Sequence, residues 1–169
     1  MSYSVANISE NWGSLDAIEY YNKNLGFQYD LVIIGKCPDE IEYEKLIKKV
    51  SQSAYKNKIK LIGIKQYVAH HEILEWTSNA SFLFCLYPNN PAIQNRIPTK
   101  MMEAWCFKTP IIFSPIDQWK SLNEKYHFGF STEEENNISD SFYDQNIPES
   151  EYLWQKMYEY YEIWFKKQF

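Results

Sequence analysis

The chain has 169 residues, of which 45% are hydrophobic and 23% charged, and its net charge is −5. This length suits one domain with a sizeable core, and the apolar fraction excludes a wholly disordered chain. The mild acidity argues against nucleic-acid binding, which requires a basic surface. The three cysteines lack the spacing of a metal knuckle and indicate free thiols in a reducing compartment.

Neither a signal peptide nor a membrane span is expected. Residues 1–10 have no basic region and no long apolar stretch. The best apolar run, at 81–87, has the length of a strand and is too short to cross a bilayer. We therefore expect a cytoplasmic protein.

Short apolar runs alternate with helical patterns along the chain. Strands are expected at 3–8, 31–34, 59–64, 81–86, 110–114 and 128–130. Helices are expected at 14–24, 38–52, 71–78, 99–107, 119–126 and 149–169. An acidic stretch without basic residues, 131–151, is expected to be a solvated loop.

This alternation predicts right-handed βαβ crossovers and a parallel sheet. The expected fold is one α/β domain over residues 1–169. It is a doubly wound, Rossmann-like and mostly parallel sheet of about six strands, with helices on both faces and a long C-terminal helix. In such sheets ligands bind beyond the carboxyl ends of the strands. The loops that follow the strands therefore hold the candidate sites.

The loop after the second strand begins with Gly35 and Lys36. Glycine allows a close turn beneath a ligand, and Lys36 could approach a phosphate, although an ordinary turn is the alternative. The sequence contains neither G-x-G-x-x-G nor a P-loop lysine motif. Dinucleotide dehydrogenases and P-loop enzymes are therefore poor interpretations.

The segment 95–105 is the richest in chemistry. Thr99 is expected to be an N-cap, and the free amides that follow it would form an anion site between Arg96 and Lys100. Arg96 is the only arginine of the chain, which suits a planar fork for phosphate as well as a chance surface position. Glu103 could accept hydrogen bonds from a ribose diol, or it could be a surface acid that complements the helix dipole.

These residues lie in segments that resemble the C-terminal half of group 1 glycosyltransferases of GT-B architecture. The resemblance is carried by LVIIGKCPDE, by IKLIGIKQYVAHHEILEWTSNASFLFCLYP and above all by RIPTKMMEAWCFKTPIIFSP. The C-terminal YLWQKMYEYYEIWFKK is similar to the closing helix of that family. The resemblance covers most of the chain, and its most specific part is the block from residue 98 to residue 115.

The resemblance implies that the donor substrate is a nucleotide diphosphate sugar, with no other cofactor and no metal. Glu103 would bind the ribose. The residues implied for the diphosphate are Lys36, Arg96, Thr99 and Lys100. Gly63, Ile64 and Lys65 would lie beside the base, and Asn95 would contact the sugar.

The sequence departs from the family pattern at three places. Asn95 stands where the family has a glutamate, so this position carries no charge. Residues 7–13 keep a glycine but lack the basic groups that usually grip the diphosphate. Phe107 and Lys108 stand where a glycine is common.

The function implied is hexosyl transfer from the donor to a glycan or lipid-linked acceptor, in polysaccharide biosynthesis. Such an enzyme needs an acceptor half, either before residue 3 or on a partner chain, so this chain alone is expected to be inactive. The full enzyme would be cytoplasmic, with the inner face of the membrane as an alternative location. Two other interpretations are a non-catalytic nucleotide- or sugar-binding module of the same fold and an interaction domain that docks through the C-terminal helix.

Two further features favour structural interpretations. His70 and His71 are adjacent and cannot share one helix face as a zinc pair does, so we expect them to begin a helix. The aromatic residues of 149–169 recur at helical spacing and form a packing face, which we favour over carbohydrate stacking.

Overall fold

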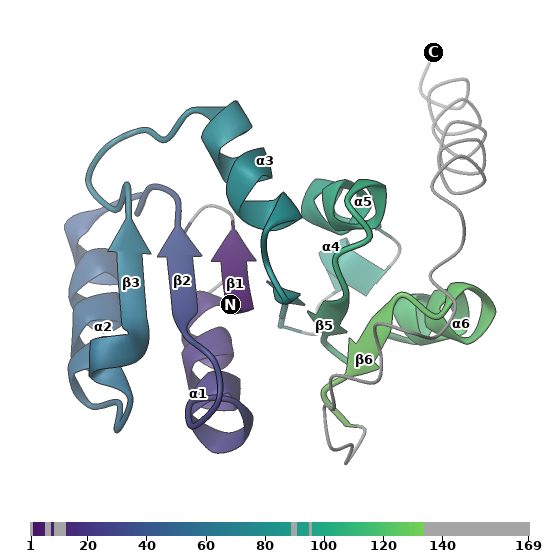
Figure 1. The fold of residues 1–169 in the computed structure, drawn as a ribbon, viewed down its shortest axis with the longest axis horizontal. Coiled ribbons are helices and arrows are strands. Elements are labelled where there is room, and N and C mark those ends of the chain that lie inside the picture. The colour runs from purple at the N-terminus through teal and green to yellow at the C-terminus, as the bar shows by residue number, and fades with distance from the viewer. Residues whose placement is uncertain (1, 6–7, 9–12, 89–90, 95, 134–169) are drawn as a thin grey trace.

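The computed structural model describes residues 2–5, 8, 13–88, 91–94 and 96–133. Its strands are β1 (Ser2–Val5), β2 (Leu31–Ile34), β3 (Ile59–Ile62), β4 (Phe82–Cys85), β5 (Ile111–Phe113) and β6 (Gly129–Ser131). Its helices are α1 (Ser14–Asn24), α2 (Glu40–Ser51), α3 (His70–Ser78), α4 (Pro91–Gln94), α5 (Thr99–Cys106) and α6 (Asp117–Tyr126), with a 3-10 helix at Lys56–Lys58. The expected alternation of parallel strands with helices is confirmed (Figure 1).

The six strands form one sheet in the order β3-β2-β1-β4-β5-β6, and every neighbouring pair is parallel. The chain first builds outward from β1 to β3 and then crosses back to place β4 on the other side of β1. The strand order therefore reverses between β1 and β4. This reversal is the topological switch point at which doubly wound sheets bind their ligands.

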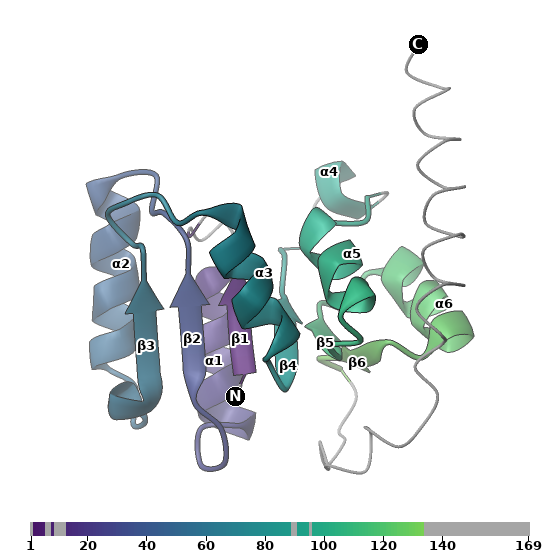
Figure 2. The ribbon, with the colours of Figure 1, turned by 45° about the horizontal axis from the view of Figure 1, so that its top comes forward.

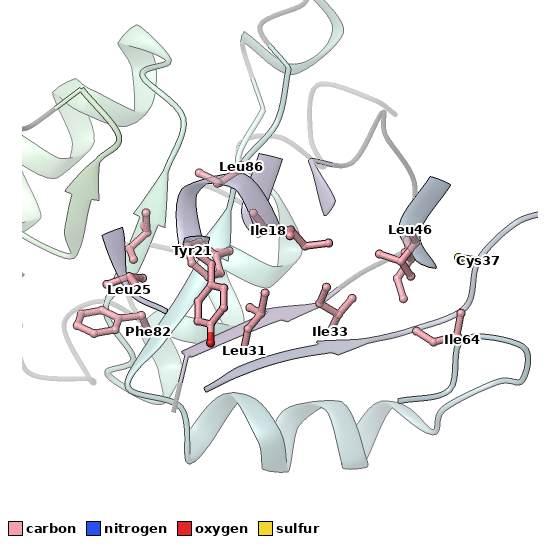
Figure 3. Packing of buried hydrophobic residues seen from close by; sticks show 14 of the residues in the cluster. Ile18, Tyr21, Leu25, Leu31, Ile33, Cys37, Leu46, Ile64, Phe82 and Leu86 are labelled. Atoms are coloured by element: carbon pink, nitrogen blue, oxygen red, sulfur yellow. The ribbon is translucent and has the colours of Figure 1, made fainter. Parts of the chain in front are cut away.

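The sheet separates two hydrophobic cores, because successive side chains of a strand point to opposite faces. Leu31 and Ile33 pack in the core beneath α1 and α2, where they join Ile18 and Tyr21 (Figure 3). Val32 and Ile34 belong to the core on the other face, with Met101 of α5 and Trp119 of α6. Figure 2 shows α3 and α5 in front of the sheet and α1 and α2 behind it. Both faces are covered, which explains the uninterrupted apolar runs of the strands.

Several expected boundaries differ from the observed ones. The strand expected at 59–64 ends at Ile62 because Gly63 turns the chain with a φ of 71°. The short helix α4 and the 3-10 helix were not predicted, and α4 interrupts the proline-containing loop after β4. The expected C-terminal helix at 149–169 and all but the first residues of the acidic stretch lie outside the described residues. Among the described helices, none has the length and apolarity needed to cross a membrane.

Candidate functional site

Backbone hydrogen bonds join the loops that follow β1, β2 and β3. The Ile8 N–H donates to the carbonyl of Lys36 (3.2 Å), and the Cys37 N–H donates to the carbonyl of Ile64 (2.9 Å). Gly63 makes the turn between β3 and its loop, and a Cβ at this position would lie 1.9 Å from Cγ2 of Val68. The loops on this side of the switch point therefore form one connected edge.

The two lysines of this edge differ in their surroundings. Lys36 is exposed beyond the end of β2, as a residue that approaches a phosphate should be. The ammonium of Lys65 lies 3.4 Å from the Glu40 carboxylate and 4.0 Å from the centre of the Tyr43 ring. Lys65 therefore faces the start of α2. The loop after β3 is fixed by its backbone, through the turn at Gly63 and the hydrogen bond to the carbonyl of Ile64.

Gly13 brings the start of α1 against the end of β4. A Cβ on Gly13 would lie 1.4 Å from the carbonyl oxygen of Leu86, and its φ of 74° is in the left-handed region. This glycine is the one that the segment 7–13 shares with the family pattern. The close approach to the Leu86 carbonyl explains why a glycine is needed at this position.

The loop ahead of α5 is held by residues that follow β4 and β5 and by a residue of α6. The Tyr87 N–H donates to the hydroxyl of Ser114 (2.8 Å), and the Tyr87 ring meets the edge of Trp119, with ring centres 5.8 Å apart. The fully buried Trp119 donates its indole N–H to the carbonyl of Arg96 (2.8 Å). The backbone of Arg96 is therefore fixed while its side chain is exposed.

The start of α5 differs in one respect from the prediction. Pro98, and not Thr99, occupies the N-cap position, and its carbonyl accepts from the Met101 N–H (2.9 Å). The first amides of an α-helix have no partner within the helix, and the side chain of the N-cap residue Pro98 does not cap them. Thr99 is the exposed first residue of the helix. The anion site at the start of α5 stays a prediction.

Lys100 is buried at this helix start, with 7% of its surface exposed. Its ammonium lies over the Tyr87 ring, 4.5 Å from the ring centre. Burial lowers the pKa of Lys100, and the nearby Cys85 thiol acts in the opposite direction. Within the described part of the chain, Lys100 forms no ion pair with a carboxylate. A buried cation beside the positive end of a helix dipole is unfavourable by itself, and a bound anion would relieve both effects.

Glu103 lies one turn further along α5 and faces the start of α3. Its Oε1 is 3.3 Å from Nε2 of His70, and 17% of the Glu103 side chain is exposed. Burial raises the pKa of Glu103, and His70 lowers it. A partly buried acceptor that is open on one side can receive hydroxyl donors from a ligand.

The structure thus brings Arg96, Thr99, Lys100 and Glu103 together on one loop and helix. Asn95 lies outside the described residues. The sequence interpretation missed His70, Tyr87 and Trp119, which act through contacts between distant segments. Only the position of the histidine at a helix start gave a signal. In the described ranges, no group of three or more His, Cys, Asp and Glu residues could hold a metal ion.

Comparison with solved structures shows what this architecture resembles. Anabaena HepE, solved with UDP and glucose, matches with a TM-score of 0.62 and 14% identity, over 78% of this chain and 34% of HepE. The C-terminal domain of the group 1 glycosyltransferase LpcC from Francisella tularensis matches with a TM-score of 0.61 and 19% identity, over 83% of this chain and 71% of that one. The fold is that of a GT-B glycosyltransferase domain.

The GT-B resemblance expected from the sequence is therefore confirmed at the level of the fold. A trehalose 6-phosphate synthase from Burkholderia multivorans also matches, with a TM-score of 0.54 and 9% identity, over 78% of this chain and 31% of that one. The chain spans about a third of the length of HepE. No protein-family model and no curated protein sequence matches it.

Proposed function

We propose that the chain is the donor-binding half of a GT-B glycosyltransferase and binds a nucleotide diphosphate sugar. The observation that carries the proposal is the start of α5, where the buried Lys100 and the amides of the first turn precede the partly buried Glu103 by one turn. The charge and hydrogen-bonding capacity of this arrangement match a diphosphate followed by a ribose.

The diphosphate would bind at the amides of Thr99 and Lys100, where the helix dipole favours negative charge. Arg96 would add a planar fork that suits phosphate oxygens, and Lys36 would approach from the loop after β2. These cations replace the basic groups that the segment 7–13 lacks. Held in place before the reaction, they stabilise the charge that develops on the leaving diphosphate.

The ribose diol would donate to the carboxylate of Glu103, and the base would lie beside the loop formed by Gly63, Ile64 and Lys65. Asn95 would contact the transferred sugar. Solved structures of HepE contain UDP and UDP-glucose, so uridine is the first base to test. The acceptor, a glycan or a lipid-linked glycan, would be bound by a second half on the same polypeptide or on a partner chain.

Calorimetric titration with UDP, ADP and GDP, beside the corresponding nucleosides, tests the proposal. Glu103→Ala removes the acceptor for the diol, and we expect nucleotide affinity to fall by about 2–3 kcal/mol because hydrogen bonds to a charged group are lost. The free energy of unfolding should change by less than about 1 kcal/mol, as for most open polar positions. Glu124→Ala, at an exposed position of α6, is the matched control.

Two results would contradict the assignment. Equal nucleotide affinity of the wild type and Glu103→Ala would remove Glu103 from the site. Equal affinity for a nucleoside and its diphosphate would remove the anion site at α5, and it would favour a non-catalytic nucleotide-binding module. The sequence feature in favour of that second function is the absence of basic residues from the segment 7–13.

A further inference from the structure

His70 is the first residue of α3, and it contacts a carboxylate on a different helix. Its Nε2 lies 3.3 Å from Oε1 of Glu103, and 62% of the His70 side chain is exposed. The next residue, His71, is also exposed, but in the described part of the chain it forms no ion pair or hydrogen bond with a side chain. Two adjacent histidines therefore differ in one contact.

This contact restrains Glu103, whose side chain otherwise has three rotatable bonds. A carboxylate presents two oxygens, and a contact with one of them restricts the direction of the other. Ordering the acceptor then costs less free energy when a ligand binds, because Glu103 is already restrained. The contact also places an imidazole beside the proposed ribose acceptor.

We propose that His70 is a positioning residue for ribose recognition: it holds Oε1 of Glu103 and leaves Oε2 to accept from the diol. This inference rests on the proposed function of Glu103. It adds a residue from α3 to the site.

Other titratable groups lie on the elements of the pair and on β4, which contacts α5. They are His71 and Glu72 on α3, Lys100 and Cys106 on α5, and Cys85 on β4. Burial raises the pKa of the Cys106 thiol, and Glu103 raises it further. His70 is the group that lowers the pKa of Glu103 against the effect of burial. Without His70, Glu103 should therefore become neutral at a higher pH.

The ratio of affinities for UDP and 2′,3′-dideoxy-UDP isolates the diol contact, because the ionisation of the diphosphate cancels. We expect a ratio on the order of tenfold or more in the wild type at pH 8. His70→Ala should lower this ratio at every pH. His70→Gln retains an N–H donor at similar reach but lacks the charge by which His70 lowers the pKa of Glu103. Its ratio should be near that of the wild type at pH 8 and should fall at a higher pH on acidification. His71→Gln is the matched control and should follow the wild type throughout.

A titration without nucleotide separates this inference from the proposed function. The ¹³C resonance of the Glu103 carboxyl should titrate at a higher pH in His70→Gln than in the wild type and His71→Gln. An unchanged titration, or affinity ratios that coincide for His70→Gln and His71→Gln at all pH values, would overturn the role of His70 alone. Failure of UDP, ADP and GDP to bind the wild type would instead overturn the proposed function, and with it the recognition of ribose.

Discussion

At the scale of single residues, Lys100 combines burial, a positive charge and a position in the first turn of a helix. Each of these makes the folded state less stable, since burial disfavours the ammonium and the helix dipole repels it. Its folded-state pKa lies below the value of 10.5 that it has when exposed. The penalty is therefore complete below the folded-state pKa and disappears as the pH rises from that value towards 10.5.

Lys100→Met should consequently stabilise the protein and weaken diphosphate binding. Methionine keeps the apolar stem in the core, and we expect the free energy of unfolding at pH 7 to rise by about 1–2 kcal/mol. The affinity for UDP should fall by roughly tenfold or more, since a charged contact is lost. Urea denaturation and calorimetry measure the two effects. Lys23→Met, at an exposed position of α1, should change neither, and a destabilised Lys100→Met would show that the charge is already compensated in the unliganded protein.

The backbone conformation of Lys108 explains why glycine is common at this position in the family pattern. It follows α5 with a φ of 56°, in the left-handed region that favours glycine. The Thr109 N–H donates to the carbonyl of Ala104 (2.9 Å), and the Lys108 N–H donates to that of Trp105 (3.0 Å). These two bonds form a Schellman motif, in which glycine is preferred at the position of Lys108.

Lys108→Gly should therefore stabilise the protein by about 1 kcal/mol, because it removes the strain of a left-handed residue with a Cβ. Thermal denaturation measures the effect. Lys48→Gly, at an exposed position inside α2, should have the opposite sign and destabilise by about 1 kcal/mol. A loss of stability in both variants would contradict the strain at Lys108.

At the scale of elements, the contact between Gly13 and Leu86 joins α1 to the end of β4. Gly13→Ala would place a methyl group 1.4 Å from the Leu86 carbonyl oxygen. The two elements would have to separate, and we expect a loss of about 3 kcal/mol in the free energy of unfolding, in the range of severe backbone clashes. Gly13→Asn distinguishes the causes, because asparagine tolerates a positive φ but retains the Cβ. Full stability in Gly13→Asn would assign the effect to backbone strain and not to the contact.

The sequence predicted elements well where a pattern was local. The periodicity of α1 and the apolar run of β2 gave their observed bounds. The predicted N-cap of α5 was wrong. Thr99 is a good capping residue by type, but the rigid φ of Pro98 suits the N-cap position just before it. The contact of His70 with Glu103 was not predictable, since it depends on how α3 packs against α5.

At the scale of the whole molecule, the strand order places the candidate site. Lys100 and Glu103 lie on α5, which joins β4 to β5, and Gly35 and Gly63 follow β2 and β3 on the other side of β1. The sequence predicted the parallel sheet and the segments that meet at its carboxyl edge. Some side chains that hold this edge in place come from other elements, such as Trp119 of α6, which donates to the carbonyl of Arg96. These contacts required the three-dimensional structure.

The division of the molecule into two cores has a consequence for how its sequence can vary. Ile33 and Ile34 are neighbours in the chain, but they pack in separate cores on opposite faces of the sheet. A change of side-chain volume at Ile33 can be compensated by substitutions in α1 or α2. A change at Ile34 can be compensated by substitutions in α5 or α6. Compensating mutations in this protein should therefore link every second position of a strand to the same helices, and leave adjacent positions to evolve independently.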